Sequence, residues 1–464
     1  MKKVLVLALS LFLVLFSLPV QATNTNASNT MFTVAFTGDH VSPDVINQIE
    51  QAGGTIVATY EKVGALQFRG PSSLMKSLKG IKSVQAVSPS FMLQLPKTSM
   101  VEFNDTQAVS TEDADLYEMY QWDIKQVTND GASYDLETGN HNVVVGIIDS
   151  GVSSTHPDLQ ANFLGGRNYV PAGGFSGTDP TETGDETDYE DRNGHGSHVA
   201  GTIAGNGRIL GVAPNVGYKA YRVFGAEGGS PTAAIAAAMI DAVDDGVDVI
   251  SMSLGGFAMM GQYTWTDPVT GETFKLGNDV ADRAIYKRAV KYANDHGVTV
   301  VVAAGNDELN ATKKKEVTDF MNAQYGPEGY KFVGAGFGVP SSVPGVITVS
   351  ATGPDYSLAS YSNYGAGFID VTAPGGDYQR YPEADYHLDM NLSAYIGTGY
   401  VWMAGTSMAT PKVSAVAALI IAKHGNIGPV KVAQMIEKTA IDIGPNGKDI
   451  YFGKGIVNAY NALR

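Results

Sequence analysis

Four polar residues stand in glycine-rich turns, and their types are those needed for nucleophilic attack on a carbonyl group. They are Asp149 in Asp-Ser-Gly, His195 in Gly-His-Gly, Asn306 after Ala-Ala-Gly and Ser407 in Gly-Thr-Ser-Met-Ala. A serine hydroxyl is a weak nucleophile until a base removes its proton, and a carboxylate can hold an imidazole in the tautomer that does so. The oxyanion that forms needs preorganised donors, such as an amide. The order Asp, His, Ser is one of the three orders known for this geometry.

Each signal is weak when it is taken alone. An Asp or Asn after a strand is usually a turn former, and a Ser before a helix is usually an N-cap. Ser407, however, precedes the segment 413–423, which is apolar on nearly every side and therefore predicts a buried helix. Pro411 is tolerated only if it lies in the first helical turn. Ser407 is then expected at the helix N-terminus, close to free N–H groups and the positive end of the dipole.

The elements that must position these residues follow an α/β pattern. Continuous apolar runs predict buried strands, and helical segments lie between them. The predicted strands are 143–148, 247–254, 298–304 and 346–349, and the predicted helices are 198–204, 232–245 and 279–296. Unbroken apolar strands that alternate with helices predict a parallel sheet covered on both faces, in three layers. Ligands bind at the carboxyl ends of such strands, where Asp149 and Asn306 stand.

The chain divides into four parts. Residues 1–22 carry Lys at positions 2 and 3, an apolar run and a Val-Gln-Ala end, which predicts a signal peptide; a membrane anchor is the alternative. Residues 23–95 read as β-α-β-β-α-β, a small α+β unit of ferredoxin-like order without a cluster of reactive side chains. Residues 96–120 predict an exposed, cleavable linker. Residues 121–464 form the α/β domain.

Composition excludes one class of partner. The 464 residues carry a formal charge of −16, and nucleic-acid binding requires a basic surface, so no nucleic-acid partner is expected. The chain has no Cys, which excludes disulfides. After the signal peptide no segment reaches the length of a membrane span. The mature protein is therefore expected to be secreted, extracellular and without a stable membrane anchor.

Four motifs in this order resemble the subtilisin family, or subtilases. They are V-V-V-G-I-I-D-S-G-V around Asp149, N-G-H-G-S-H-V-A-G-T around His195, V-V-A-A-G-N around Asn306 and G-T-S-M-A-T-P around Ser407. The resemblance covers residues 121–464 and implies a subtilisin-like fold. It implies a secreted, monomeric serine endopeptidase that acts on peptides or proteins and needs no cofactor for catalysis. It also implies a self-processing zymogen, whose residues 23–95 act as an intramolecular inhibitor and folding helper.

The resemblance assigns roles to individual residues. Ser407 attacks the scissile carbonyl, His195 accepts and returns the proton, and Asp149 orients His195. The side chain of Asn306 and the backbone N–H of Ser407 bind the oxyanion. Two segments are expected to hold the substrate as an added strand; they are Gly228, Gly229 and Ser230, and Ser253, Leu254 and Gly255.

The chain departs from the compact members of the family in several places. The acidic stretch 179–191 lies between Asp149 and His195, and it predicts a solvated loop, a calcium site or a rim that selects basic substrates. Asp158 matches a family calcium ligand, but the loop 204–209 that would complete the site is short. Metal content therefore stays open, with structural calcium doubtful and Asp158 as the candidate ligand. Further extra segments follow Gly256 and Asn306.

Alternatives to a general secreted protease remain. The segment Gln121-Trp122-Asp123-Ile124 and the length of the chain are similar to secreted lantibiotic leader peptidases, which mature a modified precursor peptide. An esterase with the same triad is a second alternative. A non-catalytic binding protein of the same fold is a third, although the intact set Asp149, His195, Asn306 and Ser407 opposes it.

Overall fold

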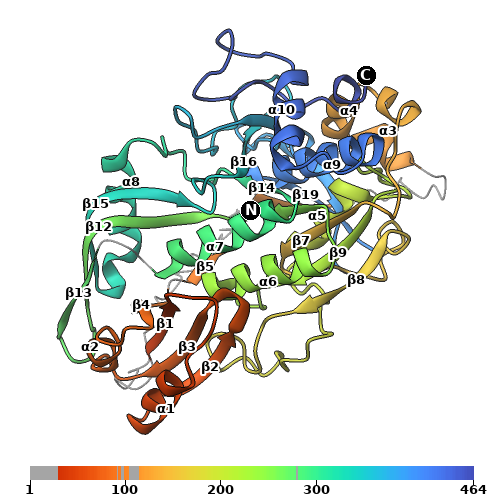
Figure 1. Cartoon of the computed structure of the whole chain (residues 1–464). Helices are drawn as coiled ribbons and strands as arrows, with labels where there is room; N and C mark the ends of the chain where they lie inside the picture. The colour runs from red at the N-terminus through yellow and green to blue at the C-terminus, as the bar shows by residue number, and fades with distance from the viewer. Residues whose placement is uncertain (1–29, 91, 96–98, 104–113, 278–280) are drawn as a thin grey trace, which may run out of the picture.

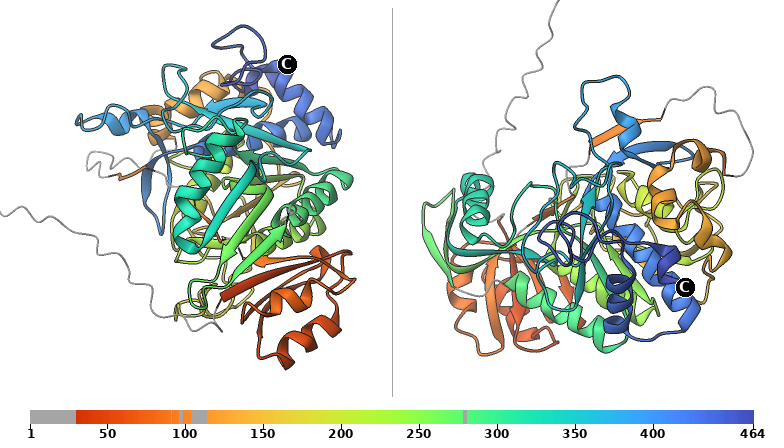
Figure 2. Two further views of the ribbon diagram at one scale, coloured as in Figure 1. Left: turned by 90° about the vertical axis from the view of Figure 1, so that its left-hand side faces the viewer. Right: turned by 90° about the horizontal axis from the view of Figure 1, so that it is seen from above.

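The computed structural model shows a small N-terminal unit against one side of a larger α/β domain (Figures 1 and 2). The described residues are 30–90, 92–95, 99–103, 114–277 and 281–464. The predicted signal peptide and residues 104–113 of the predicted linker lie outside them. The described part of that linker contains two elements, the strand β6 (Ser99–Glu102) and the helix α3 (Asp115–Tyr120).

The larger domain is built on a seven-stranded parallel sheet, which confirms the predicted fold class. In spatial order its strands are β17 (Val371–Pro374), β16 (Val346–Thr352), β14 (Thr299–Ala303), β11 (Val249–Met252), β7 (Val144–Asp149), β9 (Gly217–Arg222) and β8 (Phe163–Asn168). The four predicted strands are present. The sequence did not reveal β8, β9 and β17, because the first two carry Gly, Lys and Arg and the third has only four residues.

Helices cover both faces of this sheet. One face packs against α4 (Trp122–Thr128), α5 (His195–Ala204), α9 (Thr406–His424), α10 (Pro429–Thr439) and α11 (Ala459–Ala462). The other packs against α6 (Thr232–Asp244) and α7 (Ala281–Asp295). Successive side chains of strand β14 point to opposite faces of the sheet. Val301 packs in the core on the α9 side, and Val300 and Val302 pack in the core on the α6 and α7 side.

Helix α9 runs through the first core and is buried along Thr406–Ile421. Ser407 lies at its N-terminal end, as predicted, but Pro411 does not lie in the first turn, because it is the sixth residue of the helix. Proline lacks the N–H that would bond to the carbonyl four residues earlier, which is that of Ser407. The hydroxyl of Ser253 donates to this carbonyl instead, at 2.7 Å. A side chain of the site therefore compensates for the interrupted helix.

A buried ion pair ties α9 to α4. The Lys412 ammonium lies 2.7 Å from the Asp123 carboxylate, and both side chains are at most 1% exposed. The ammonium also donates to the carbonyl of Met408 and to Oδ1 of Asn391. Burial lowers the pKa of Lys412, while the charge and hydrogen bond of Asp123 oppose that shift. The pair fixes the helix that carries Ser407.

The N-terminal unit has the element order expected from the sequence. Its four-stranded antiparallel sheet has the order β2-β3-β1-β4. The elements are β1 (Thr30–Phe36), α1 (Pro43–Gln51), β2 (Thr55–Tyr60), β3 (Ala65–Gly70), α2 (Leu74–Leu78) and β4 (Val84–Pro89). Four short 3₁₀ helices complete the described part of the chain, at Glu61–Val63, Ala132–Asp135, Gly326–Glu328 and Tyr386–Asp389.

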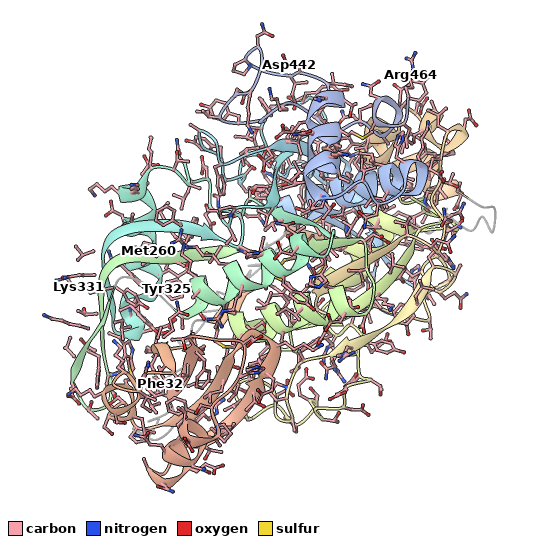
Figure 3. All side chains as sticks on the ribbon, in the orientation of Figure 1. Phe32, Met260, Tyr325, Lys331, Asp442 and Arg464 are labelled. Atoms are coloured by element: carbon pink, nitrogen blue, oxygen red, sulfur yellow. The ribbon has the colours of Figure 1, made fainter. Side chains whose placement is uncertain are left out.

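The unit packs on α6 and α7 and on an arm formed by two of the extra segments. The arm consists of the antiparallel strands β12 (Gly256–Thr266), β13 (Thr273–Gly277) and β15 (Tyr330–Val339) with helix α8 (Lys314–Tyr325). Figure 3 shows Phe32 in the small unit and Met260 and Lys331 on the arm. The Phe32 ring packs edge-on against Trp265 at 6.0 Å, within one shared apolar core.

Within the described residues, no single helix is long and apolar enough to cross a membrane. One pair of helices, α9 and α10, passes the same test together but is bent by 111°.

The buried pair generates a stability prediction. Lys412→Met is expected to lower the free energy of unfolding by about 3–5 kcal/mol, because it leaves Asp123 as an uncompensated buried charge. The double variant Lys412→Met/Asp123→Leu should recover most of that loss. The free energy of unfolding of each variant is measured by urea unfolding. All variants are made in the Ser407→Ala background, which lacks the candidate nucleophile. The matched control is Lys315→Met, because Lys315 pairs with Asp319 on the surface and exposed pairs contribute about 0–1 kcal/mol. Equal losses at both lysines would contradict the prediction.

Candidate active site

Asp149 and His195 come together at the carboxyl edge of the sheet. Asp149 is the last residue of β7 and His195 is the first of α5. Nδ1 of His195 lies 2.8 Å from Oδ1 of Asp149, and both side chains are almost completely buried. A carboxylate at Nδ1 makes that nitrogen the donor, so Nε2 keeps its lone pair. Nε2 has no hydrogen-bond partner among the described residues.

Glycines on either side allow His195 to take this place. Gly194 has φ of 93°, and a Cβ there would lie 2.0 Å from the ring of Tyr395. A Cβ on Gly196 would lie 2.1 Å from the carbonyl oxygen of Gly151. Any side chain at either position would displace backbone or an aromatic ring, so the motif Gly-His-Gly is a steric requirement of the turn.

Asp191 holds this turn, a role that the sequence reading missed. Its Oδ1 accepts hydrogen bonds from the backbone N–H groups of Asn193 and Gly194. Its Oδ2 accepts from the N–H and the hydroxyl of Ser197, at 2.9 and 2.7 Å. Burial raises the pKa of Asp191, and these hydrogen bonds oppose the rise. The one available signal was the Asp-x-Asn-Gly pattern, typical of an Asp that bonds to the backbone ahead of it.

The pKa of His195 is raised above its usual value. Burial lowers it, but the charge and hydrogen bond of Asp149, together with the charge of Asp191, outweigh that effect. Two carboxylates therefore stabilise the protonated imidazole. This is the state that a general base reaches after it accepts a proton.

Ser407 is held by Ser253 in this structure. The Ser407 hydroxyl donates to the carbonyl of Ser253 at 3.2 Å, and the Ser253 hydroxyl donates to the carbonyl of Ser407. Ser253 was predicted as a substrate-binding residue, and the structure adds that it supports the serine.

Asn306 presents its amide N–H₂ group to the site. Its Oδ1 accepts from the N–H and the hydroxyl of Thr406, at 2.9 and 2.8 Å. These two bonds identify the oxygen and leave Nδ2 buried and without a partner among the described residues. Oδ1 of Asn363 accepts from the N–H groups of Asp307 and Leu309 and so holds the loop. Thr406 and Asn363 carry no distinguishing signal in the sequence.

The first predicted substrate segment pairs with a strand of this chain. Strand β10 (Gly229–Pro231) forms an antiparallel ladder with β5 (Met92–Gln94), in which Ser230 faces Leu93. The N–H of Leu95 donates to the carbonyl of Gly228 at 2.9 Å. Of the second segment, Leu254 is buried in the core and Gly255 lines the adjacent cavity.

The next described segment after residue 95 pairs with a different strand. Strand β6 pairs antiparallel with β19 (Tyr400–Ala404), which also pairs with β18 (Asn391–Ala394). Ser99 faces Ala404, three residues before Ser407. The described residues on either side of 96–98 thus pair with two different strands, and one of these, β19, leads directly to the candidate nucleophile.

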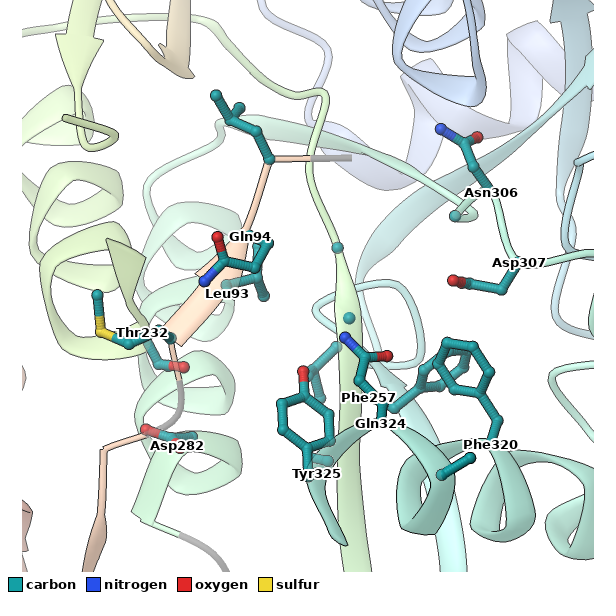
Figure 4. A pocket seen from close by; sticks show the side chains of 18 residues that line it. Leu93, Gln94, Thr232, Phe257, Asp282, Asn306, Asp307, Phe320, Gln324 and Tyr325 are labelled. Carbon is teal, nitrogen blue, oxygen red and sulfur yellow. The ribbon is translucent and has the colours of Figure 1, made fainter. Parts of the chain in front are cut away.

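A cavity of about 510 Å³ opens beside β5 (Figure 4). Gly255, Gly256 and Phe257 are among the residues that line it. Asn306 and Asp307 lie on one side, and Thr232 and Asp282 lie on the other, next to Leu93.

The acidic stretch 179–191 is anchored internally. Glu182 pairs with Arg222, and both side chains are completely buried. Glu182 also accepts from the N–H of Ala226, just before the β10 segment. The stretch is therefore a loop with a buried anchor at Glu182, and these contacts do not test the selection of basic substrates.

Protein donors bind one oxygen of Asp158, the candidate calcium ligand. Its Oδ2 accepts from the N–H of Ile209 and the hydroxyl of Tyr400, at 3.0 and 2.9 Å. Donor groups of the protein thus occupy one of the two carboxylate oxygens of Asp158. The described residues contain no group of three or more His, Cys, Asp or Glu side chains placed to hold a metal.

Comparisons with a family model and with individual proteins all indicate the same family. A family model described as "Subtilase family" matches residues 140–455. The nisin leader peptide-processing serine protease NisP of Lactococcus lactis subsp. lactis is 37% identical over 350 residues, which cover 73% of this chain. That match covers 49% of the nisin relative, so this chain matches about half of its length.

Two further relatives act on another leader peptide. The epidermin leader peptide-processing serine protease EpiP of Staphylococcus epidermidis is 31% identical over 405 residues, covering 85% of this chain and 84% of the relative. The crystal structure of the epidermin leader peptide processing serine protease from Staphylococcus aureus matches with a TM-score of 0.77 and 29% identity. It covers 94% of this chain and 98% of the other.

The geometry of His195 predicts the pH dependence of activity. A general base must be neutral, and a raised pKa keeps His195 protonated to higher pH. The rate, kcat/KM, of the enzyme without its N-terminal unit should therefore rise with pH, with a midpoint above the usual pKa of 6.5 for a histidine side chain. Asp191→Asn removes one of the charges that raise the pKa, so the midpoint should move to lower pH. The matched control is Asp185→Asn, because the Asp185 carboxylate bonds only within its own exposed loop. A midpoint that moves equally in both variants, or in neither, would show that Asp191 does not act on His195.

Proposed function

Because this chain belongs to the subtilase family of serine peptidases, we propose that it is an exported, monomeric serine endopeptidase made as a self-processing zymogen. The observation that carries the proposal is the path of residues 92–95 and 99–102. They pair with β10 on one side of Ser407 and with β19 on the other. An extended peptide added to strand edges is how a protein holds a chain by its backbone.

Ser407, His195 and Asp149 form the catalytic group in this proposal. The Ser407 hydroxyl leaves the carbonyl of Ser253 and donates to Nε2 of His195, whose lone pair is free. Ser407 Oγ then attacks the substrate carbonyl while His195 takes the proton, and Asp149 stabilises the resulting imidazolium. His195 next gives that proton to the leaving amine. Water repeats the sequence to release the acyl group.

Asn306 stabilises the oxyanion in the same proposal. Its Nδ2 group is buried, has no partner among the described residues and is fixed in orientation by Thr406. A preorganised donor stabilises the charge as it develops without having to reorganise. The N–H of Ser407 is the second donor. No cofactor takes part in these steps.

Residues 23–95 act as the inhibitor. The unit covers α6, α7 and the arm, and its continuation β5 occupies the strand edge that a substrate would use. Salt bridges from Lys62 to Asp241 and Asp244 add to this contact. The pairing of β5 with β10 and of β6 with β19 supports a cut in the segment between Leu95 and Ser99.

A second candidate narrows the substrate to a modified precursor peptide. Two relatives of this chain and a matching crystal structure are named as leader peptide-processing proteases. The arm and the fastened loop around Glu182 lie beside the cleft, and such additions restrict which chains can enter. We propose maturation of a lantibiotic-type precursor as the specific form of the activity.

Self-processing has a direct test. Ser407→Ala should leave the polypeptide in one piece, because the nucleophile is absent, whereas the wild-type protein should separate into two. Intact-mass measurement of both proteins, purified with inhibitors of other proteases, distinguishes these outcomes. Ser414→Ala is the matched control, since Ser414 lies on the same helix and bonds to Ser251 away from the cleft. Separation of the Ser407→Ala protein would refute self-processing.

Substrate range separates the two forms of the proposal. A precursor-specific enzyme should make one defined cut in a modified precursor peptide and release little acid-soluble material from casein. Mass spectrometry of both digests gives the result. Broad digestion of casein would support a general secreted protease. Labelling by a fluorophosphonate without cleavage of any peptide would support an esterase, and no labelling would support a binding protein.

A further inference from the structure

An acidic side chain lies buried and unpaired on one side of the substrate cavity. Asp282 is the second residue of α7 and is 3% exposed. Neither of its carboxyl oxygens has a hydrogen-bond partner among the described residues. Figure 4 shows it beside Thr232, on the side of the cavity that holds Leu93.

The surroundings of Asp282 supply no charge to balance it. Burial raises the pKa of Asp282 to about 7, and the nearby hydroxyl of Thr232, which lies outside hydrogen-bond geometry, opposes the rise. Tyr286 on the same helix and Tyr330 of β15 interact with it electrostatically. Burial raises the pKa of both tyrosines above the usual value, so neither becomes charged near neutral pH. No salt bridge to Asp282 occurs within the described part of the chain.

The side chain that now fills the subsite gives the acid nothing to bind. Leu93 is buried, and its Cδ1 atom lies 3.3 Å from the place where a Cβ on Gly256 would be. A leucine has no donor, and a buried carboxyl group without a partner is unfavourable. An acid retained only for helix stability would bond to the N–H groups of the first turn, but Asp282 makes no such bond.

A substrate side chain with a positive charge would satisfy the group. Lys and Arg carry donors on long apolar stems, so the stem can take the place of Leu93 while the head reaches the carboxylate. We propose that Asp282 selects a basic side chain at the substrate position that Leu93 occupies in the zymogen. The inference rests on the proposed endopeptidase function. This preference explains how the cleft can bind the N-terminal unit, which places Leu93 there, and still favour a substrate with a basic side chain at that position.

Two synthetic peptides test the proposal, namely the parent sequence of residues 90–102 and the same peptide with the substitution Leu93→Lys. The enzyme freed of its N-terminal unit should cut the substituted peptide faster than the parent by about tenfold or more at about pH 8.5, where Asp282 is ionised. The ratio of the two kcat/KM values should fall at about pH 5.5, where the acid is neutral. Protonation of His195 changes kcat/KM for both peptides by the same factor, so its effect cancels in the ratio.

Two variants keep the test decisive. Asp282→Asn should remove the pH dependence of the ratio, and Asp282→Leu should reverse the preference toward the parent peptide. Thermal unfolding and titration with a fluorophosphonate show whether each variant is folded and what fraction is active. If Asp282→Leu does not fold, the pH dependence of the rate ratio in Asp282→Asn is sufficient to test the proposal.

The peptide with the substitution Met100→Lys is the matched control. Met100 lies in β6, is 49% exposed and does not line the cavity that contains Asp282. The rate for this control, relative to the parent peptide, should therefore not change with pH. Equal rates for the parent and the Leu93→Lys peptide in the wild-type enzyme, or an unchanged ratio in Asp282→Asn, would overturn the inference. Failure of the proposed endopeptidase function would look different, since no peptide would be cut at all.

Discussion

The burial of α9 on every side is the constraint on which the rest of the site depends. A helix inside the core cannot shift without opening the packing around it, so Ser407 at its end is placed by the core rather than by a loop. Pro411 removes one helical hydrogen bond, and Ser253 replaces it. Lys412 brings a charge into the same core and therefore requires Asp123. The position of Ser407 thus follows from the way the interrupted helix is stabilised.

The other groups are brought to that helix end by the direction of the strands. Parallel strands present their carboxyl ends along one edge, and Asp149 and Asn306 follow two strands of the same sheet. His195 comes from a helix on one face and is held by its glycine neighbours and Asp191. Strand edges left open beside these groups can pair with a peptide. The chain's own segments β5 and β6 pair with them here.

The sequence predicted the parts of this arrangement that have a local signature. Apolar strand runs predicted the central sheet correctly, and glycine-flanked polar residues singled out Asp149, His195, Asn306 and Ser407 as candidates. Pairing between distant segments could not be predicted in the same way. The arm is an example, since β12 and β15 lie far apart in the chain and contain several glycines that weaken a strand pattern.

Residues whose role depends on hydrogen bonds formed in the folded chain could not be predicted from the sequence either. Asp191 looked like the end of an acidic stretch, and Glu182 like part of a solvated loop, because their hydrogen bonds to the backbone turn and to Arg222 exist only after folding. Asp282 has no motif at all. Asp282 is of interest because it is buried, lacks a hydrogen-bond partner and lies beside a cavity. These are properties of the folded chain that a single sequence does not show.

The N-terminal residue of the mature enzyme tests the central claim most directly. The claim is that the chain lies across its own catalytic group as a substrate, held by β5 on one side and β6 on the other. N-terminal sequencing and intact mass of freshly separated wild-type protein should place the first cut between Leu95 and Ser99. A first cut before Met92 or after Glu102, seen at the earliest time of separation, would contradict the account.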